Sequence, residues 1–226
     1  MDAARNTRSI DSLEWTSLTT DVAHELPLLP DTAVSSGSRF RILEAGLVLF
    51  AHRGYHGTSI REIAAAAGLQ SASLYGHFSS KESILAELVL VGHEAHHRAL
   101  TLALMECGSD PVEQLRALVE AHVGAHADFP VLAVVANHEL MHLSSEAAAP
   151  AEVFRDQSLS LFMTVVGRGM AAGAFDVPQP DVIMTAIATM GSSVAAWYPT
   201  RRHDISRETL CRSYADLAVR MVERRQ

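Results

Sequence analysis

Residues 58–81, TSIREIAAAAGLQSASLYGHFSSK, predict two short helices joined by a tight turn. Ser59 and Glu62 have the spacing of a capping box, in which each side chain bonds the other residue's backbone amide. The first helix is therefore expected to begin directly after Ser59. The four alanines at 64–67 would let another helix cross closely, and Gly68 can adopt the left-handed conformation that ends a helix.

The second and third helices of this stretch carry their own start signals. Ser71 is expected to cap the second helix, while Leu74 and Phe78 would hold its back against the core. Ser79 and Glu82 repeat the capping-box spacing and predict the start of a third helix. Two short helices around a tight turn are the layout of a helix-turn-helix, so the stretch favours DNA binding.

The same stretch resembles the TetR family of bacterial transcriptional regulators. It carries a threonine followed by I-A-x-x-A-G, then L-Y-x-H-F, then S-K-E, and the resemblance continues upstream through RILEAGLVLFAHRGYHGTS. It covers about residues 39–90. The resemblance implies an all-α protein with an N-terminal three-helix helix-turn-helix domain and a C-terminal helical domain for effector binding and dimerisation. The matching residues are Thr58, Ile63, Ala64, Ala67, Gly68, Leu74, Tyr75, His77, Phe78, Ser80, Lys81 and Glu82.

Position by position, the resemblance implies which residues touch DNA. Arg61 suits the paired acceptors of a guanine, with a solvated surface charge as the alternative, and Tyr75 either contacts a phosphate or packs on the next helix. Lys81 would place a cation near a phosphate, so Lys81→Ala is expected to weaken binding to all sequences and to flatten its salt dependence. The implied base contacts are Arg61, Gln70, Ser71, Ala72 and Ser73, and the implied phosphate contacts are Thr58, Tyr75, His77 and Lys81.

Charge is unevenly distributed along the chain. The whole chain of 226 residues carries a formal net charge of −8, which argues against a generally basic nucleic-acid binder. Residues 38–81 contain five basic and two acidic side chains, a sum of +3, so the remainder sums to −11. A basic segment on an acidic body favours one docking orientation, and binding is expected to weaken with salt.

Composition indicates an ordinary globular protein, because 48% of the residues are hydrophobic. The two cysteines, Cys107 and Cys211, are far apart and form no C-x-x-C pair, which favours reduced thiols over a disulfide or zinc framework. The sequence has no apolar run of membrane-spanning length and no basic-then-apolar leader pattern, so a cytoplasmic location is expected. No cofactor is expected.

The chain divides into three predicted parts. Residues 1–37 are rich in acidic and turn-forming residues and predict a flexible arm, 38–83 form the helix-turn-helix domain, and 84–226 form the effector-binding and dimerisation domain. Within these parts, helices are expected at about 39–53, 81–106 and 206–223. Prolines favour the first turn of a helix, so four further helices are expected to begin at Pro111, Pro130, Pro150 and the pair Pro178 and Pro180.

Four histidines lie on helix faces that otherwise read as buried. His122 and His126 share a stripe with Leu115 and Val119, and His138 and His142 share one with Val131 and Val135. Hydrogen-bonded core or pocket histidines are the first interpretation, and a metal-responsive regulator on the same scaffold is the alternative.

His138, Glu139 and His142 also spell H-E-x-x-H. That pattern is the zinc-peptidase signature, in which two histidines on one helical face bind zinc and the glutamate is the base. A zinc-dependent hydrolase is therefore an alternative from another class. No downstream third ligand of the H-x-x-G-x-x-H kind follows, so the regulator is preferred and no enzyme is predicted.

The resemblance also implies a body pocket whose occupation lowers the affinity for DNA. The segment AAWYPTRRHDIS resembles the subgroup that senses fatty-acyl or steroid-derived acyl thioesters of coenzyme A, with Arg201 and Arg202 as candidates for its phosphates. The predicted pocket residues are His122, His126, Phe129, Val135, His138, His142, Phe162, Val165 and Trp197.

The last two long apolar segments, 181–198 and 206–222, are apolar on more than one face. Core packing explains such helices, but the resemblance favours a four-helix homodimer interface. A homodimer would read a near-palindromic operator with half-sites about 34 Å apart. The predicted interface residues are Ile183, Ile187, Met190, Val194, Leu210, Tyr214, Leu217 and Met221.

Overall fold

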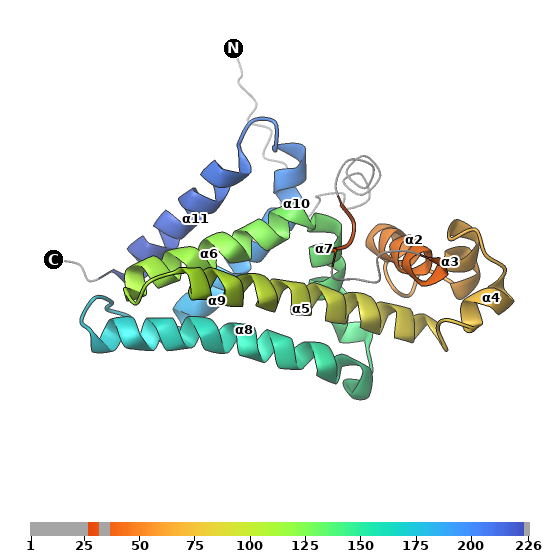
Figure 1. The fold of residues 1–226 in the computed structure, drawn as a ribbon, viewed down its shortest axis with the longest axis horizontal. Helices are drawn as coiled ribbons and strands as arrows, with labels where there is room; N and C mark the ends of the chain where they lie inside the picture. The colour runs from red at the N-terminus through yellow and green to blue at the C-terminus, as the bar shows by residue number, and fades with distance from the viewer. Residues whose placement is uncertain (1–26, 32–36, 224–226) are drawn as a thin grey trace, which may run out of the picture.

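The computed structural model describes residues 27–31 and 37–223, and it is built from α-helices. Within that part of the chain, the only β-type pairing is an isolated bridge between Phe175 and Glu223, so the all-α prediction is confirmed. Figure 1 shows a small helical head at one end of a longer helical body, joined by one helix. The elements are α2 (Ser38–Arg53), α3 (Ile60–Ala66), α4 (Ser71–Tyr75), α5 (Lys81–Glu106), α6 (Pro111–Asp128), α7 (Pro130–His138), η2 (Leu140–His142), α8 (Ser145–Ala171), α9 (Pro180–Ser192), α10 (Val194–Trp197), η3 (Tyr198–Thr200) and α11 (Arg207–Val222).

The head consists of α2, α3 and α4. The capping box between Ser59 and Glu62 is confirmed at the start of α3, and Gly68 has the predicted left-handed conformation with φ at 68°. The expected cap of α4 is wrong, because Gln70 occupies the N-cap position and Ser71 is already the first helical residue. The helix α4 therefore begins one residue earlier than the serine pattern indicates.

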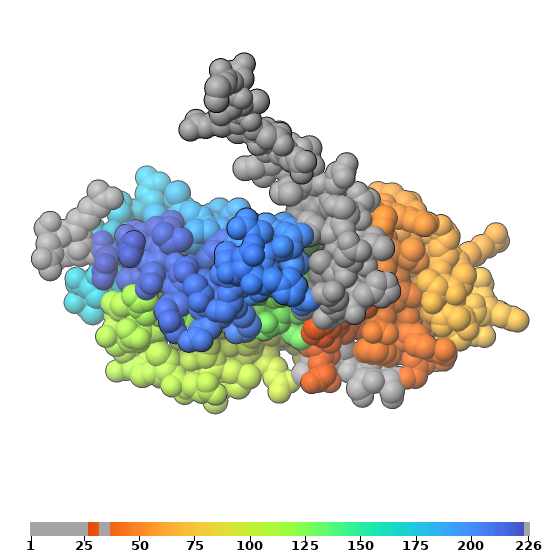
Figure 2. Space-filling model, turned by 90° about the horizontal axis from the view of Figure 1, so that it is seen from above, coloured from red at the N-terminus to blue at the C-terminus, as the bar shows by residue number. Residues whose placement is uncertain are grey.

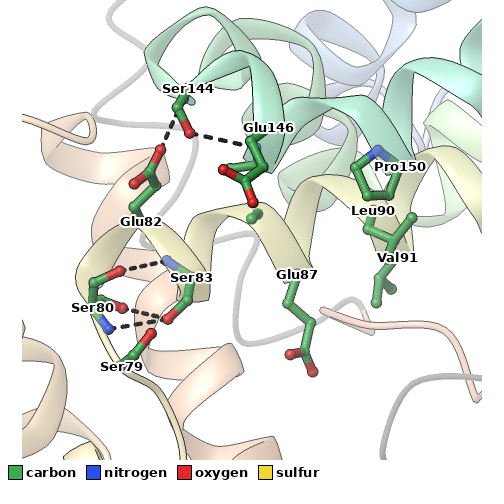
Figure 3. A pocket seen from close by; sticks show the side chains of 12 residues that line it. Ser79, Ser80, Glu82, Ser83, Glu87, Leu90, Val91, Ser144, Glu146 and Pro150 are labelled. Carbon is green, nitrogen blue, oxygen red and sulfur yellow. Dashed lines mark hydrogen bonds between the residues drawn. The ribbon is translucent and has the colours of Figure 1, made fainter.

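The capping box at the start of α5 uses different partners from those predicted. Ser80 and Ser83 form it, with Ser83 N bonding Ser80 Oγ at 3.0 Å, whereas the expected pair was Ser79 and Glu82 (Figure 3). The carboxylate of Glu82 instead accepts the backbone N–H of Ser144 at 2.8 Å. Glu82 thus joins the start of α5 to the start of α8.

Proline marks three of the four body helix starts that the sequence predicts. Pro111, Pro130 and Pro180 are the first residues of α6, α7 and α9. Pro150 lies inside α8, because Ser144 caps that helix six residues earlier by accepting the N–H of Ala147. The apolar segment 181–198 is not one helix: α9 ends at Ser192, and α10 and η3 follow it.

Two hydrophobic clusters fill the described part of the molecule. The first joins the head to the near half of α5 and to α7, and the second fills the body. α5 contributes Ile84 and Leu88 to the first cluster and Leu100 to the second, so a single 26-residue helix is anchored in both. At 1.5 Å per residue it is about 39 Å long.

The predicted arm at 1–37 lies mostly outside the described residues. Of the short described segment 27–31, Leu29 is 7% exposed and packs against the first cluster. This short segment is therefore in contact with the core, and the flexible arm stays a prediction for the rest of 1–37.

Polar contacts hold the helices of the body together. Arg207 at the start of α11 donates two hydrogen bonds of 2.6 Å to Asp128 at the end of α6, and Arg116 pairs with Asp216 between the same two helices. Gly191 of α9 lies against α6 so closely that an added Cβ would come within 2.2 Å of the His122 ring. That contact fixes the position of His122 between α6 and α9.

Over the described residues, none of the helices is by itself long and apolar enough to cross a bilayer. Taken together, α6 and α7 pass the same length and composition test, but they meet at a bend of 101°. Most side chains on the inner faces of both helices are buried in this fold, as expected for core helices.

Candidate DNA interface and body cavity

The tip of the head presents a surface of small polar side chains around one arginine. Arg61 of α3, Gln70 and the α4 residues Ala72 and Ser73 are exposed, and Ser71 is partly exposed. Tyr75 is 55% exposed, and His77 is also exposed. The opposite side of α4 is held by Leu74 and Phe78, which are 0% and 3% exposed. Figure 2 shows this end of the molecule projecting away from the blue C-terminal helices.

Two of the predicted phosphate contacts point into the protein. Thr58 is 2% exposed, and its hydroxyl donates to the carbonyls of Leu49 and Gly54 at 3.2 and 3.0 Å. Lys81 Nζ donates to the carbonyls of Tyr55 and Thr58 at 2.6 and 2.8 Å. Both side chains bond backbone carbonyls in the last turn of α2 and in the segment between α2 and α3, so in this structure they hold the head together.

The cation next to Tyr55 has a further partner. Lys81 Nζ lies 4.0 Å from the centroid of the Tyr55 ring, and burial lowers its pKa while raising that of Tyr55. A cation over an aromatic face is stabilised by the ring quadrupole. This contact adds to the two hydrogen bonds in fixing Lys81 inside the head.

Ion pairs reduce the positive charge that the head offers to DNA. Arg39 pairs with Glu87 of α5, and Arg53 pairs with Glu62 at 2.7 Å. With Lys81 turned inward, Arg41 and Arg61 are the basic side chains of the 38–81 segment that form no ion pair within the described chain. Electrostatic steering is therefore weaker than the residue count indicates.

A cavity of about 790 Å³ lies in the body between α5, α6, α7, α8 and α9. The predicted pocket residues His122, His126, Phe129 and Phe162 line it. Sequence reasoning missed His93 and His96 of α5, although their spacing of three residues in HEAHH could have indicated one helical face. Arg155 and Arg207 also line the cavity, whereas the predicted Arg201 is ion-paired with Asp204 at 2.9 Å.

The other predicted pocket residues are outside this lining. Val135 and Val165 are 1% and 2% exposed and belong to the first and second clusters, and Trp197 packs against the second. Helical periodicity identified these faces as buried, but burial inside a core and exposure to a cavity give the same pattern.

The H-E-x-x-H residues are not on one helix. α7 ends at His138, Glu139 is its C-cap, and His142 lies in the short helix η2. Glu139 accepts the backbone N–H of Tyr55 at 3.0 Å, and the His142 ring stacks on the Tyr55 ring with centroids 6.0 Å apart. The expected helix is wrong over this motif, and Glu139 and His142 instead join the body to the end of α2.

The cavity histidines are held neutral by their surroundings. Burial lowers the pKa of His122 to about 3 and that of His93 to about 4. Burial also lowers the pKa of His126, and it lowers that of His96 well below its ordinary value, with neighbouring histidines adding to the effect. A buried imidazole avoids charge because the low-dielectric interior solvates the cation poorly.

A second hollow, of about 720 Å³, lies where the head meets the body. It is an open groove between the first turns of α5 and α8, and the Glu82 to Ser144 hydrogen bond crosses it (Figure 3). Serine and glutamate side chains dominate its lining. This groove separates the two elements whose spacing would change if α5 tilted.

The predicted dimer residues divide into three groups by exposure. Ile187, Val194 and Leu210 are 1%, 0% and 3% exposed, so their side chains belong to the core of this chain and not to a surface that could meet a copy. Leu217 and Met221 of α11 are 46% and 36% exposed. The remaining three, Ile183, Met190 and Tyr214, are partly exposed.

The fold and the sequence both match a known family. The family model for bacterial regulatory proteins of the tetR family matches residues 42–88, and that for the tetracyclin repressor-like C-terminal domain matches 108–222, half of the chain. This chain belongs to the TetR family. It is therefore a helix-turn-helix DNA-binding transcriptional regulator, as the resemblance predicted.

Individual TetR-family relatives agree with this assignment. The transcriptional repressor KstR2 of Rhodococcus jostii is 33% identical over 150 residues, which cover 66% of this chain and 73% of KstR2. A tetR-family regulatory protein of Rhodococcus RHA1 has a similar structure, with a TM-score of 0.76 and 32% identity over 84% of this chain and 100% of that one. AibR, solved with isovaleryl coenzyme A and operator DNA, shares the fold, with a TM-score of 0.70 and 23% identity over 83% of this chain and 98% of AibR.

Proposed function

We propose that this TetR-family chain is a repressor that binds a near-palindromic operator as a homodimer and is released by a small effector in the body cavity. The supporting observation is α5, whose first turns pack in the head cluster while His93 and His96, three turns later, line the cavity. A ligand that repacks the cavity wall would therefore tilt a helix that is fixed to the head. Such a ligand lowers operator affinity only by binding the two arrangements unequally.

The effector that we propose is an acyl thioester of coenzyme A. Phe129, Leu132, Phe162 and Met184 give the cavity apolar walls for an acyl chain. Arg155 lines the same cavity and offers a fork that suits phosphate. AibR, which shares this fold, forms a complex with isovaleryl coenzyme A and operator DNA, and that complex supports this class of effector.

The effector proposal is tested on a selected operator. Duplexes are selected from a random pool by the purified chain, and release is followed by fluorescence anisotropy during titration with short, medium and sterol-derived acyl thioesters. Free coenzyme A and the free acids serve as controls. We expect release by at least one thioester and by neither control. Operator binding that no thioester changes would overturn the effector class and leave the DNA-binding proposal standing.

The homodimer proposal is supported by the exposed apolar side chains of α11. An isolated head contacts few base pairs, and a two-fold pair of heads doubles the contacts. Leu217→Glu combined with Met221→Glu would place four charges in the proposed interface. We expect monomers by analytical ultracentrifugation and loss of operator binding, whereas Met105→Glu, at a more exposed site that is 76% exposed, should change neither. A double variant that remains dimeric would place the interface elsewhere.

A zinc hydrolase that uses His138, Glu139 and His142 is not supported by the geometry. Zinc peptidases need both histidines on one helical face, and here α7 ends between them. Glu139 is already bonded to the Tyr55 amide, so it does not stand free as a base. Peptidase activity that Glu139→Gln abolishes would contradict this conclusion.

A further inference from the structure

Three imidazoles meet at one point of the body cavity. His96 comes from α5, and His122 and His126 come from successive turns of α6. His96 Nε2 lies 2.8 Å from His122 Nδ1, and one ring nitrogen from each of the three histidines lies within 4.8 Å of the other two. The ring centroids are 4.6 to 5.5 Å apart. The three rings therefore form one contact cluster.

The backbone decides which nitrogens of the α6 pair are available. His122 Nε2 lies 3.1 Å from the carbonyl oxygen of Ala188, and His126 Nδ1 lies 2.8 Å from the carbonyl oxygen of His122. A carbonyl only accepts, so both of these nitrogens carry the proton. His122 Nδ1 and His126 Nε2 are therefore left with lone pairs. Metal-binding histidines characteristically donate their other N–H to a backbone carbonyl in this way.

The remaining contacts at these lone pairs are weak or exchangeable. Asn137 Nδ2 approaches His126 Nε2 at 3.4 Å, but the same amide already donates to the Ala133 carbonyl at 2.8 Å. His96 Nε2 is the donor to His122 Nδ1, and it becomes a lone-pair nitrogen when its ring proton moves to Nδ1.

A fourth histidine provides an independent observation. His93 lies one turn before His96 on α5, lines the same cavity and is 7% exposed. Its Nε2 is buried without a hydrogen-bond partner. Buried polar atoms are normally satisfied, so the wall of this cavity has an unused hydrogen-bonding group close in sequence to His96.

We propose that His96 Nε2, His122 Nδ1 and His126 Nε2 bind one divalent transition-metal ion of the zinc type. Imidazole nitrogens suit zinc, copper, nickel and iron, and three protein ligands leave a fourth position for an exogenous group. In a tetrahedral zinc site with Zn–N bonds near 2.05 Å, the ligand nitrogens lie about 3.3 Å apart. His96 has to move slightly away from His122, and the pair exchanges its hydrogen bond for two metal bonds.

The fourth ligand is expected to come from the cavity. Once the His93 ring turns into the cavity, its unpartnered Nε2 can hydrogen-bond a water or an oxygen of an effector on the ion. An ion that binds an effector oxygen at its fourth position would be part of the effector site. Such an ion would also explain why a cluster of histidines lies among the apolar walls of the cavity. The metal site itself does not depend on repression, because it can be measured without DNA.

The test is metal binding by the full chain after treatment with a chelator and desalting. Zn²⁺ is titrated by calorimetry with elemental analysis of the product, and Co²⁺ is used as a spectroscopic probe for tetrahedral coordination. We expect one ion per chain and the visible absorption of tetrahedral Co²⁺. His96→Gln and His126→Gln should each weaken binding about 100-fold or more, since each removes a ligand.

The matched control is His97→Gln. His97 is the neighbour of His96 on α5, and its Nδ1 is 3.3 Å from Ser158 Oγ, outside the cluster. We expect binding like that of the unmodified chain. Zn²⁺ binding that survives both His96→Gln and His126→Gln, or no binding by the unmodified chain, would overturn the proposal.

A measurement without variants covers the case in which a substitution unfolds the chain. ¹⁵N spectra of the histidine rings of the unmodified protein should show three rings shifting together when one equivalent of Zn²⁺ is added. Shifts confined to exposed histidines such as His203 would contradict the site. Metal binding without any operator binding would refute only the repressor proposal.

Discussion

The DNA-reading head and the body cavity differ in where they place their polar side chains: the head displays them on its surface, and the body points them into a cavity. The head displays polar side chains on two helices that are adjacent in sequence, and it uses buried Thr58 and partly exposed Lys81 to fix its backbone. The cavity brings together His96 of α5 and His122 of α6, which are 26 residues apart in sequence, and His122 is buried. The exposed side chains of the head are free to contact DNA, whereas burial lowers the pKa values of the cavity histidines. The comparison indicates which side chains can be changed without loss of the fold.

Arg61→Ala is the change with the largest expected effect on binding. A bidentate contact with guanine is worth about 1–3 kcal/mol, and two heads would double it to about 2–6 kcal/mol per operator. Because Arg61 is exposed, the free energy of unfolding should stay unchanged. Anisotropy on the selected operator and urea unfolding measure the two quantities. Unchanged affinity and unchanged base preference would remove Arg61 from the base contacts.

The cavity histidines should make the stability of the chain depend on pH between pH 7 and pH 5. Its histidines have pKa values below that of the unfolded chain, so the unfolded state binds more protons and stability is lost as pH falls below about 6.5. For His122 alone the loss between pH 7 and pH 5 is about 2 kcal/mol. Urea unfolding with a chelator present measures it.

Two variants distinguish the contribution of the cavity histidines to acid sensitivity from that of exposed histidines. His122→Gln should flatten the dependence of stability on pH, while His203→Gln, at an exposed site, should leave it unchanged. Equal slopes in all three proteins would show that the cavity histidines do not control acid stability.

Lys81→Met tests whether this cation belongs to the fold or to the DNA surface. Losing two hydrogen bonds from a cation to backbone carbonyls should destabilise the chain by about 1–2 kcal/mol. The salt dependence of operator binding should keep its slope, contrary to the expectation from sequence. Arg61→Met is the reference, with an unchanged unfolding midpoint. A flattened slope with normal stability would return Lys81 to the phosphate contacts.

Tyr75→Phe should have the smallest effect. Tyr75 is 55% exposed on α4, and its hydroxyl would contribute one hydrogen bond to a phosphate. One such bond is worth about 0.5–1.5 kcal/mol, or roughly two- to twelvefold in affinity for each head. The loss should be the same for all sequences in competition binding. A loss confined to the selected operator would make Tyr75 a base contact.

The head could be predicted from the sequence because its signals are local. Ser59, Glu62 and Gly68 act within a few residues, and the structure confirms them. The prediction is off by one residue at α5 because several serines share the spacing and a distant residue, Ser144, takes the Glu82 carboxylate. Capping rules consider only residues close in sequence, so they cannot predict that Ser144 bonds the Glu82 carboxylate.

The cavity could be predicted only in part. Periodicity placed His122 and His126 on a buried face, but their partner His96 depends on how α5 crosses α6, which no local pattern encodes. The same limit applies to Val194 and Leu210, whose apolar faces are core and not surface. Periodicity indicates that a helix face is buried, but tertiary packing decides whether it meets the core, a cavity or another subunit.

Sequence-selective DNA binding tests the central claim most directly. The purified chain is equilibrated with its selected duplex and with a scrambled duplex of the same composition, at one fixed salt concentration of about 0.1 M. Specific recognition predicts at least about a thousandfold preference for the selected, near-palindromic duplex. Equal affinity for the two duplexes would contradict the account of the head as a reader of sequence.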